Sequence, residues 1–212
     1  MTRSKAEWRR PLLEARRGRS DEARRADAAA LAAGLPAVLD GVGDPVCLFV
    51  AVRGEPGATP DGALPVLDVA RALGRRVLLP VTVGGAPLDW ASYDGPDALG
   101  PGPHGVLEPT GPRLGPSAVA GAGLVVVPAL AVDHRGVRLG RGGGHYDRTL
   151  PLAGAATRLV ALVGDDELVE GPLPAEPHDV AVHAVWRPRT GVTPLPLSSA
   201  RRRPRGPAWG PR

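Results

Sequence analysis

The strongest constraint on the fold is a series of short apolar runs that have the length of β-strands. Each run is continuously apolar rather than alternating, which is typical of strands covered on both faces. Helix-forming segments separate the runs, so the sequence predicts a layered α/β domain with a mainly parallel or mixed central sheet. The expected strands are residues 46–52, 76–81, 124–128, 158–164 and 180–186.

Three segments have the features of helices. Residues 3–17 combine apolar positions with many arginines, although Pro11 would remove a hydrogen bond from the interior of such a helix. A second helix is expected over residues 20–34, between a serine N-cap and a glycine. A third is expected over residues 59–74, where Thr-Pro-Asp offers an N-cap, a proline at the first helical position and an early acid.

The remaining segments form an insertion and a tail. Residues 84–117 are rich in Gly, Pro and Asp, and they predict a long insertion with one short strand near residues 88–93. Residues 188–212 are rich in Pro, Arg, Ser and Gly, and we expect them to be disordered because they offer few apolar side chains. Residues 1–187 are therefore expected to form a single domain.

The distribution of charge argues against a nucleic-acid-binding protein, although the pI is about 10.1. Residues 198–212 carry five arginines and no acid, and residues 1–25 carry nine basic and four acidic residues. Since the whole chain is +4 and each of these ends is +5, residues 26–197 carry a net charge of −6. A mildly acidic body with basic ends does not predict an extended basic surface that binds a nucleic-acid phosphate backbone.

Cysteine content and hydropathy point to a cytoplasmic protein. Cys47 is the single cysteine, which excludes an internal disulfide. No apolar signal core lies near the N-terminus, and the longest apolar run, residues 124–132, is far too short to span a bilayer. We expect a monomer without membrane or specific nucleic-acid partners.

The segment RLGRGGGHYDRTL, residues 138–150, places four glycines within five positions. Glycine loses more conformational freedom on folding than any other residue, so such a run needs a reason. The loop follows a buried strand and precedes a short expected helix, which is a position where open α/β sheets bind ligands. Its backbone N–H groups, the helix N-terminus and the forks of Arg138 and Arg141 would suit phosphate oxygens.

Two common phosphate-binding motifs do not match this loop. A P-loop ends in Gly-Lys-Ser/Thr, which is missing here, and the dinucleotide fingerprint would need a glycine where His145 stands. Asp147 could hold Mg²⁺ against bound phosphates, or it could serve only the helix dipole. The loop residues by themselves leave a phosphate site and a structural glycine turn both open.

A longer segment, VVVPALAVDHRGVRLGRGGGHYDRTL, closely resembles the signature of the 5-formyltetrahydrofolate cyclo-ligases, also called methenyltetrahydrofolate synthetases. The shared features are a strand that ends in proline, an aspartate after a short apolar linker, Gly-x-Arg-Leu-Gly, a glycine loop and Tyr-Asp. Other stretches are similar in the same order, so the resemblance covers roughly residues 3–187. These are KAEWRRPLLEAR with Lys5, Arg9 and Arg16, AVRGEPGAT with Glu55, GVLEPTGP with Glu108, and PAEPHDVAV with Asp179.

The resemblance implies an enzyme, a ligase that forms a C–N bond, on a Rossmann-like three-layer α/β fold of the NagB, RpiA and CoA-transferase type. ATP, with Mg²⁺, would phosphorylate the formyl oxygen of 5-formyltetrahydrofolate. N10 would then close the ring, and the products would be 5,10-methenyltetrahydrofolate, ADP and phosphate. In such a phosphoryl transfer the protein mainly positions the reactants and neutralises the charge on the phosphates.

The resemblance also implies a set of site residues. The ATP-binding residues would be Lys5, Arg9, Arg138, Leu139, Gly140, Arg141, Gly142, Gly143, Gly144, His145 and Tyr146. The residues that bind the folate would be Val50, Glu55, Arg141, Gly142, Gly143, Gly144 and His145. Arg141 and Tyr146 would be catalytic, and Asp147 and Asp179 would bind Mg²⁺.

The chain departs from the family pattern at four places. His145 and Val132 replace a tyrosine and a phenylalanine, Pro11 lies inside the first expected helix, and the spacing from Glu55 to Thr59 is one residue longer. None of these changes removes an implied phosphate or magnesium ligand, so we expect activity with an altered folate pocket. Two alternatives are a non-catalytic relative that binds folate or nucleotide and a basic-tailed protein associated with nucleic acid.

Overall fold

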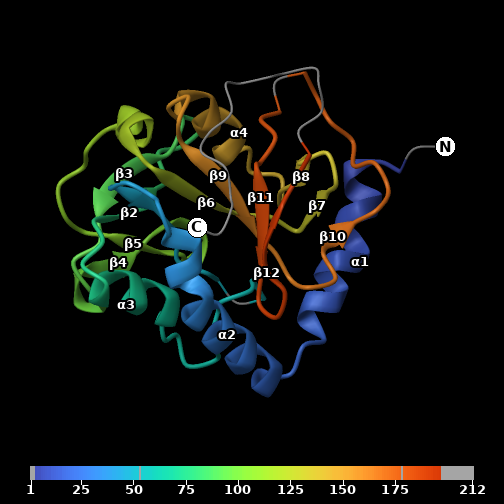
Figure 1. Ribbon diagram of the computed structural model, residues 1–212, viewed down its shortest axis with the longest axis horizontal. Helices are drawn as coiled ribbons and strands as arrows, with labels where there is room; N and C mark the ends of the chain where they lie inside the picture. Colours follow the sequence, from blue (N-terminus) through green and yellow to red (C-terminus); the bar gives the residue numbers. More distant parts are fainter. Residues whose placement is uncertain (1–2, 53, 178, 197–212) are drawn as a thin grey trace.

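The computed structural model describes residues 3–52, 54–177 and 179–196. A seven-stranded sheet with the order β12-β11-β9-β6-β1-β2-β3 forms its centre (Figure 1). Strands β11, β9, β6, β1 and β2 are parallel, and β3 and β12 pair antiparallel at the two edges. The expected mixed sheet is confirmed. The strands are β1 (Val46–Cys47), β2 (Val77–Val81), β3 (Asp89–Ser92), β6 (Leu124–Pro128), β9 (Arg158–Leu162), β11 (Ala184–Arg187) and β12 (Gly191–Pro194).

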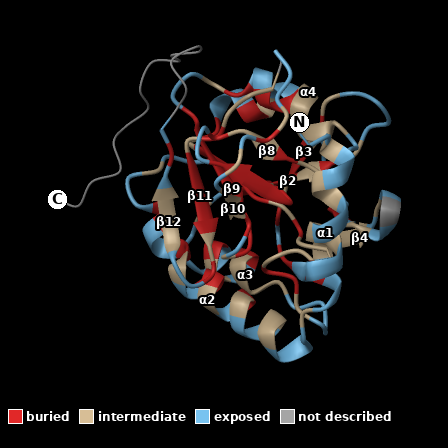
Figure 2. Cartoon of the chain, turned by 90° about the vertical axis from the view of Figure 1, so that its right-hand side faces the viewer, coloured by how far each residue is buried: buried red, intermediate tan, exposed pale blue. Residues whose placement is uncertain are grey.

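Helices cover both faces of this sheet and complete a three-layer arrangement. On one face, α2 (Asp21–Leu39) and α3 (Pro65–Ala72) pack against side chains such as Val126. The other face is covered by η3 (Pro116–Gly121), α4 (His145–Thr149) and η4 (Leu150–Leu152), which pack against Val125 and Val127. Successive side chains of a strand point to opposite faces, so β6 is buried on both sides. Figure 2 shows the buried strands between partly exposed helices.

The remaining elements lie at the rim of the large sheet. β10 (Leu168–Val169), β7 (Ala131–Asp133) and β8 (Arg138–Leu139) form a three-stranded sheet in that order. α1 (Lys5–Arg17) packs Trp8 and Leu12 against this small sheet. A hairpin of β4 (Leu99–Pro101) and β5 (Leu107–Pro109) fills the long insertion, with η1 (Pro96–Ala98) before it and η2 (Pro103–Gly105) at its turn.

Two of the three expected helices have different bounds from those predicted. α2 continues through Gly34 and Pro36 to Leu39, because its apolar side is buried against the sheet, and this packing overrides the local signal to stop. α3 begins at Pro65 rather than near residue 59. Thr59 Oγ1 instead donates a hydrogen bond to the Ala63 carbonyl at 3.0 Å, which holds a turn ahead of the helix. α1 has nearly the predicted extent.

Three strand or tail predictions are corrected. Only Val46–Cys47 of the expected strand 46–52 belongs to the sheet, and of the expected strand 180–186 only the residues from Ala184 onward are paired. The predicted disordered tail contains β12, which pairs with β11 and buries Leu195. Residues 197–212, the rest of that tail, lie outside the described residues.

The strand order creates a switch point between β1 and β6. From β1 the sheet grows toward β2 and β3 on one side, and toward β6, β9 and β11 on the other. Connections leave these two strands in opposite directions, so a crevice opens beyond their carboxyl ends, where open α/β sheets bind ligands. Among the described residues no helix has the length and apolar character needed to cross a membrane.

Candidate active site

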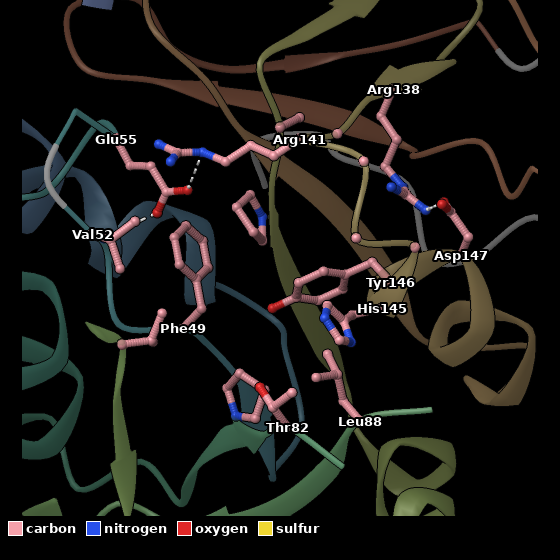
Figure 3. A pocket seen from close by; sticks show the side chains of 18 of the residues that line it. Phe49, Val52, Glu55, Thr82, Leu88, Arg138, Arg141, His145, Tyr146 and Asp147 are labelled. Atoms are coloured by element: carbon pink, nitrogen blue, oxygen red, sulfur yellow. Dashed lines mark hydrogen bonds and ion pairs between the residues drawn. The ribbon is translucent and has the colours of Figure 1, made fainter. Parts of the chain in front are cut away.

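A cavity of about 390 Å³ lies at this switch point. Its walls come from the carboxyl ends of the central strands, from α1, from the β4–β5 hairpin and from the glycine loop before α4. Figure 3 shows the part of the cavity around Glu55, Arg141 and Tyr146. Every site residue predicted from the sequence lines the cavity. These residues are Lys5, Arg9, Val50, Glu55, Arg138, Leu139, Gly140, Arg141, Gly142, Gly143, Gly144, His145, Tyr146, Asp147 and Asp179.

The glycine loop has a backbone that suits glycine at two positions. Gly142 has φ +108° and Gly144 has φ +68°, conformations that other residues adopt only with strain. A Cβ at Gly144 would also stand 2.6 Å from Arg148 Nη1. The loop is therefore a defined structure rather than a flexible connector. The helix that follows it, α4, has only five residues, so the helix dipole contributes little to binding an anion.

α1 brings two cations to the glycine loop from the other end of the chain. Arg9 Nε donates to the Gly140 carbonyl at 2.9 Å. Lys5 Nζ lies 2.9 Å from Glu176 Oε1 and 3.5 Å from Asp179 Oδ2. These carboxylates raise the pKa of Lys5, mainly through the hydrogen bond that Lys5 donates to Glu176. Pro11 leaves α1 continuous, so Lys5 and Arg9 reach the same cavity.

Glu55 supplies a buried carboxylate on the opposite wall. One of its oxygens accepts a hydrogen bond from the Val52 N–H at 3.0 Å, and the other lies 3.3 Å from Arg141 Nε (Figure 3). The Glu55 side chain is 9% exposed, and its burial raises the pKa of the carboxyl, which Arg141 partly offsets. Such a carboxylate suits a ligand edge made of N–H donors.

Tyr146 and His145 form the wall between the glycine loop and Glu55. The Tyr146 ring points into the cavity in Figure 3. Its hydroxyl has no hydrogen-bond partner among the described residues, and burial, followed by the charge of Glu55, raises its pKa. An unpaired buried hydroxyl is costly, so it is suited to bond a ligand. His145 Nδ1 lies 3.4 Å from Arg148 Nη2, which holds its ring against the loop.

The two carboxylates predicted to bind metal each face a cation. Asp147 pairs with Arg138, and Asp179 pairs with Lys5 and accepts a hydrogen bond from the Glu176 N–H at 2.8 Å. Both line the cavity. In the parts of the chain that the structure describes, no three His, Cys, Asp or Glu side chains form a group that could hold a metal ion.

Several lining residues carried no role in the sequence prediction. Arg16 and Glu108 belong to stretches of the family resemblance, but neither was assigned to the site. Glu108 is buried and accepts a hydrogen bond from the Thr82 N–H at 2.9 Å. Thr82 and Leu88 line the cavity below Tyr146, and Phe49 lines it to one side (Figure 3). Phe49 lies two residues after β1 and Thr82 directly follows β2, so the rule that ligands bind beyond strand ends would have found them.

Comparison with known proteins identifies the family of the chain. The model of the 5-formyltetrahydrofolate cyclo-ligase family matches residues 1–188. A 5-formyltetrahydrofolate cyclo-ligase from Mycolicibacterium smegmatis is 42% identical over 198 residues, which cover 91% of this chain and 98% of that protein.

Two solved structures have a similar fold. A 5,10-methenyltetrahydrofolate synthetase from Aquifex aeolicus aligns with a TM-score of 0.68 and 27% identity, covering 93% of this chain and 95% of that one. The enzyme of the same name from Mycoplasma pneumoniae aligns with a TM-score of 0.65 and 15% identity over 86% of this chain and 98% of that one, a likeness of fold alone. With a family match over nearly its whole length and a relative at this level of identity, the chain belongs to the 5-formyltetrahydrofolate cyclo-ligase family.

Proposed function

We propose that the protein uses ATP to convert 5-formyltetrahydrofolate into 5,10-methenyltetrahydrofolate. The observation that carries this proposal is a single cavity in which a cation-rich glycine loop faces a buried carboxylate. The γ-phosphoryl group would pass from ATP to the formyl oxygen, which breaks the bond to ADP. N10 would then attack the formyl carbon and lose its proton to water, and the C–O bond would break as phosphate leaves with that oxygen.

The loop side of the cavity would bind ATP. Lys5, Arg9 and Arg138 line it together with the loop residues Leu139, Gly140, Gly142, Gly143 and Gly144, and with His145 and Tyr146. Several fixed cations around a transferring phosphoryl group neutralise the charge on its oxygens and keep the reactants in line. Lys5 and Arg9 come from α1, so the first helix is part of the nucleotide site in this proposal.

The opposite side would bind the folate. The pterin edge offers N–H donors, which Glu55 would accept, while Val50 would contact the ring from the strand end. Tyr146 would donate its hydroxyl, which bonds no other group in the described part of the chain, to the substrate. His145 and the glycines would border both substrates, and they would place the formyl oxygen near the γ-phosphate.

Arg141 has the position of a catalytic residue in this scheme. It belongs to the glycine loop, yet its guanidinium reaches Glu55 at 3.3 Å. Its side chain is 44% exposed, so little desolvation opposes its movement to a new partner. We propose that Arg141 neutralises the phosphoryl group as it moves between the two substrates, because it links the two sides of the cavity.

Mg²⁺ would supply further charge neutralisation on the phosphates. The residues fit an ion that arrives with its phosphate ligands, since Mg²⁺ commonly takes one or two carboxylates and keeps water and phosphate oxygens. Asp147 and Asp179 would hold it. Arg138 and Lys5, their present partners, also line the cavity and would contact the phosphates.

The proposal is tested by assaying the purified protein with ATP, Mg²⁺ and 5-formyltetrahydrofolate. We expect the absorbance of the methenyl product and the release of ADP to rise together in equal amounts. Substrate binding without turnover would refute the cyclo-ligase activity and favour the non-catalytic relative. A cytoplasmic location, a monomeric state and the lack of specific nucleic-acid binding stay predictions from the sequence.

A further inference from the structure

Arg16 is a buried cation at the C-terminal end of α1 that the proposed chemistry does not use. The residue is 4% exposed, and Glu167, which faces it, is 9% exposed. Arg16 Nε donates to Glu167 Oε1 at 2.6 Å, and its Nη2 donates to Glu167 Oε2 at 2.7 Å and to the Ala129 carbonyl at 2.5 Å. This is a bidentate pair with a third bond to the backbone, an arrangement that only the planar fork of arginine provides.

The partners of Arg16 lie just beyond two central strands of the large sheet. Ala129 directly follows β6, and Glu167 stands in the loop between β9 and β10. The Glu167 carboxylate also accepts a hydrogen bond from the Gly164 N–H at 2.5 Å, and its carbonyl accepts one from the Val132 N–H at 2.9 Å. β6 and β9 are neighbours in the sheet, so Arg16 ties α1 to the segments that follow these two central strands.

The geometry of α1 links this anchor to the nucleotide side of the cavity. Lys5, Arg9 and Arg16 stand at positions i, i+4 and i+11, so at about 100° per residue they lie within about 40° on one side of the helix. Arg16 is about 16 Å along the axis from Lys5 at about 1.5 Å per residue. A tilt of about 10° at Arg16 would therefore move Lys5 by about 3 Å, which is more than a phosphate contact tolerates.

The other end of α1 is held less firmly. The side chains of the Lys5–Glu176 pair are 29% and 53% exposed, against 5% and 11% for Arg16 and Glu167. Exposed ion pairs contribute little to stability, whereas breaking a buried pair is strongly destabilising. Together with the packing of Trp8 and Leu12, the buried pair at Arg16 therefore sets the position of Lys5 and Arg9.

We propose that Arg16 and Glu167 are a positioning pair that places α1, so that Lys5 and Arg9 meet the phosphates of ATP. The inference rests on the proposed function. Arg16 is not itself a catalytic residue in this proposal, because its Nε and Nη2 donors are directed to Glu167 and Ala129.

The test separates placement from stability. Arg16→Met alone leaves the Glu167 carboxylate buried without its cation and should lower Tm, whereas Arg16→Met combined with Glu167→Gln removes both charges and should recover much of that loss. We expect the double variant to keep a KM for ATP raised about tenfold, the effect of one lost charge-assisted contact. Its kcat and its KM for 5-formyltetrahydrofolate should stay within about twofold of wild type.

If the double variant regains both Tm and the wild-type KM for ATP, the pair is merely structural and the proposal is overturned. Should the double variant fail to fold, Arg16→Lys provides the same test. Lysine keeps the charge but loses the fork, so the KM for ATP should again rise without a matching fall in kcat. An Arg16→Lys enzyme with wild-type KM for ATP would contradict the inference.

Arg75 provides a matched control. Its Nε donates to Asp44 Oδ1 at 2.9 Å and its Nη2 to the Val42 carbonyl at 2.7 Å, but it does not line the cavity. Arg75→Met should lower Tm without changing the KM for ATP. A wild-type protein without turnover would refute the proposed function itself, whereas a turning-over wild type with unaffected Arg16 variants refutes only the role of the pair.

Discussion

Replacing Glu55 with glutamine tests how the folate is held. The substitution keeps the size of the side chain but removes its charge and turns one acceptor into a donor. A hydrogen bond to a charged group contributes about 1.5–3 kcal/mol, so losing one such bond to the pterin should lower kcat/KM for 5-formyltetrahydrofolate about ten- to a hundredfold. The KM for ATP should change little, because Glu55 lies on the wall opposite the phosphate side.

Although Glu55→Gln should lower activity, it should not lower the stability of the fold. Burial raises the pKa of Glu55, so protonation stabilises the fold below the pKa of the unfolded chain, and that stabilisation is lost as the pH rises through the raised value. At neutral pH the ionised carboxylate therefore costs stability, and Glu55→Gln should keep or raise Tm. Arg141, its partner, is 44% exposed and can be solvated.

Steady-state kinetics with each substrate varied in turn, together with thermal unfolding, measure both effects. In the wild type kcat/KM for the folate should fall as the pH drops through the raised pKa of Glu55, and this acid limb should flatten in Glu55→Gln. Glu14→Gln, an exposed change on α1, is the control. Wild-type kcat/KM for the folate in Glu55→Gln, or an equal loss toward both substrates caused by a lower Tm, would refute the reasoning.

Three further substitutions test the other parts of the cavity. Asp147→Asn should lower kcat about a hundredfold at low Mg²⁺ and raise the Mg²⁺ concentration needed for half-maximal rate. An unchanged Mg²⁺ titration would show that this carboxylate does not hold the ion. Tyr146→Phe removes a buried hydroxyl that has no partner among the described residues, so Tm should hold or rise while kcat/KM for the folate falls about three- to tenfold. A fall in Tm would mean that the hydroxyl serves the fold. Gly142→Ala places a Cβ at φ +108° and 3.5 Å from Arg9 Cζ, so a strain of about 1–3 kcal/mol should weaken ATP binding in a titration. Gly121→Ala meets no atom within 4 Å and serves as its control.

The sequence predicted the sheet and the gathering of the site because both depend on strong patterns. The apolar runs of β2, β6 and β9 are buried on both faces, and a run of this kind has few other places in a fold. The family resemblance brought Lys5, Glu55 and Asp179 together with the glycine loop, although no local pattern in the chain relates these distant positions.

The errors arose where tertiary packing overrides local signals. Gly34 and Pro36 usually end helices, yet α2 continues because Leu35 and Val38 are buried against the sheet. β12 was not predicted because backbone hydrogen bonds join it to β11, and a composition rich in Pro and Arg gives no sign of such pairing. The burial of Arg16 was not predicted, since its partner Glu167 lies 151 positions away in the sequence.

The contacts of α1 also set an order of events during synthesis. α1, with Trp8 and Leu12, is the first described element to leave the ribosome. Arg16 can form its ion pair only after Glu167 has been synthesised, and Lys5 can form its pairs only after Glu176 and Asp179. Contacts between residues so far apart in the sequence form late, because closing the long loop between them loses chain entropy before the contact adds stability. The nascent chain can therefore build most of its sheet while α1 is still undocked. The nucleotide site would therefore be completed only after Glu167, Glu176 and Asp179 have been made, so a chain released earlier carries the glycine loop before Lys5 and Arg16 have met their partners.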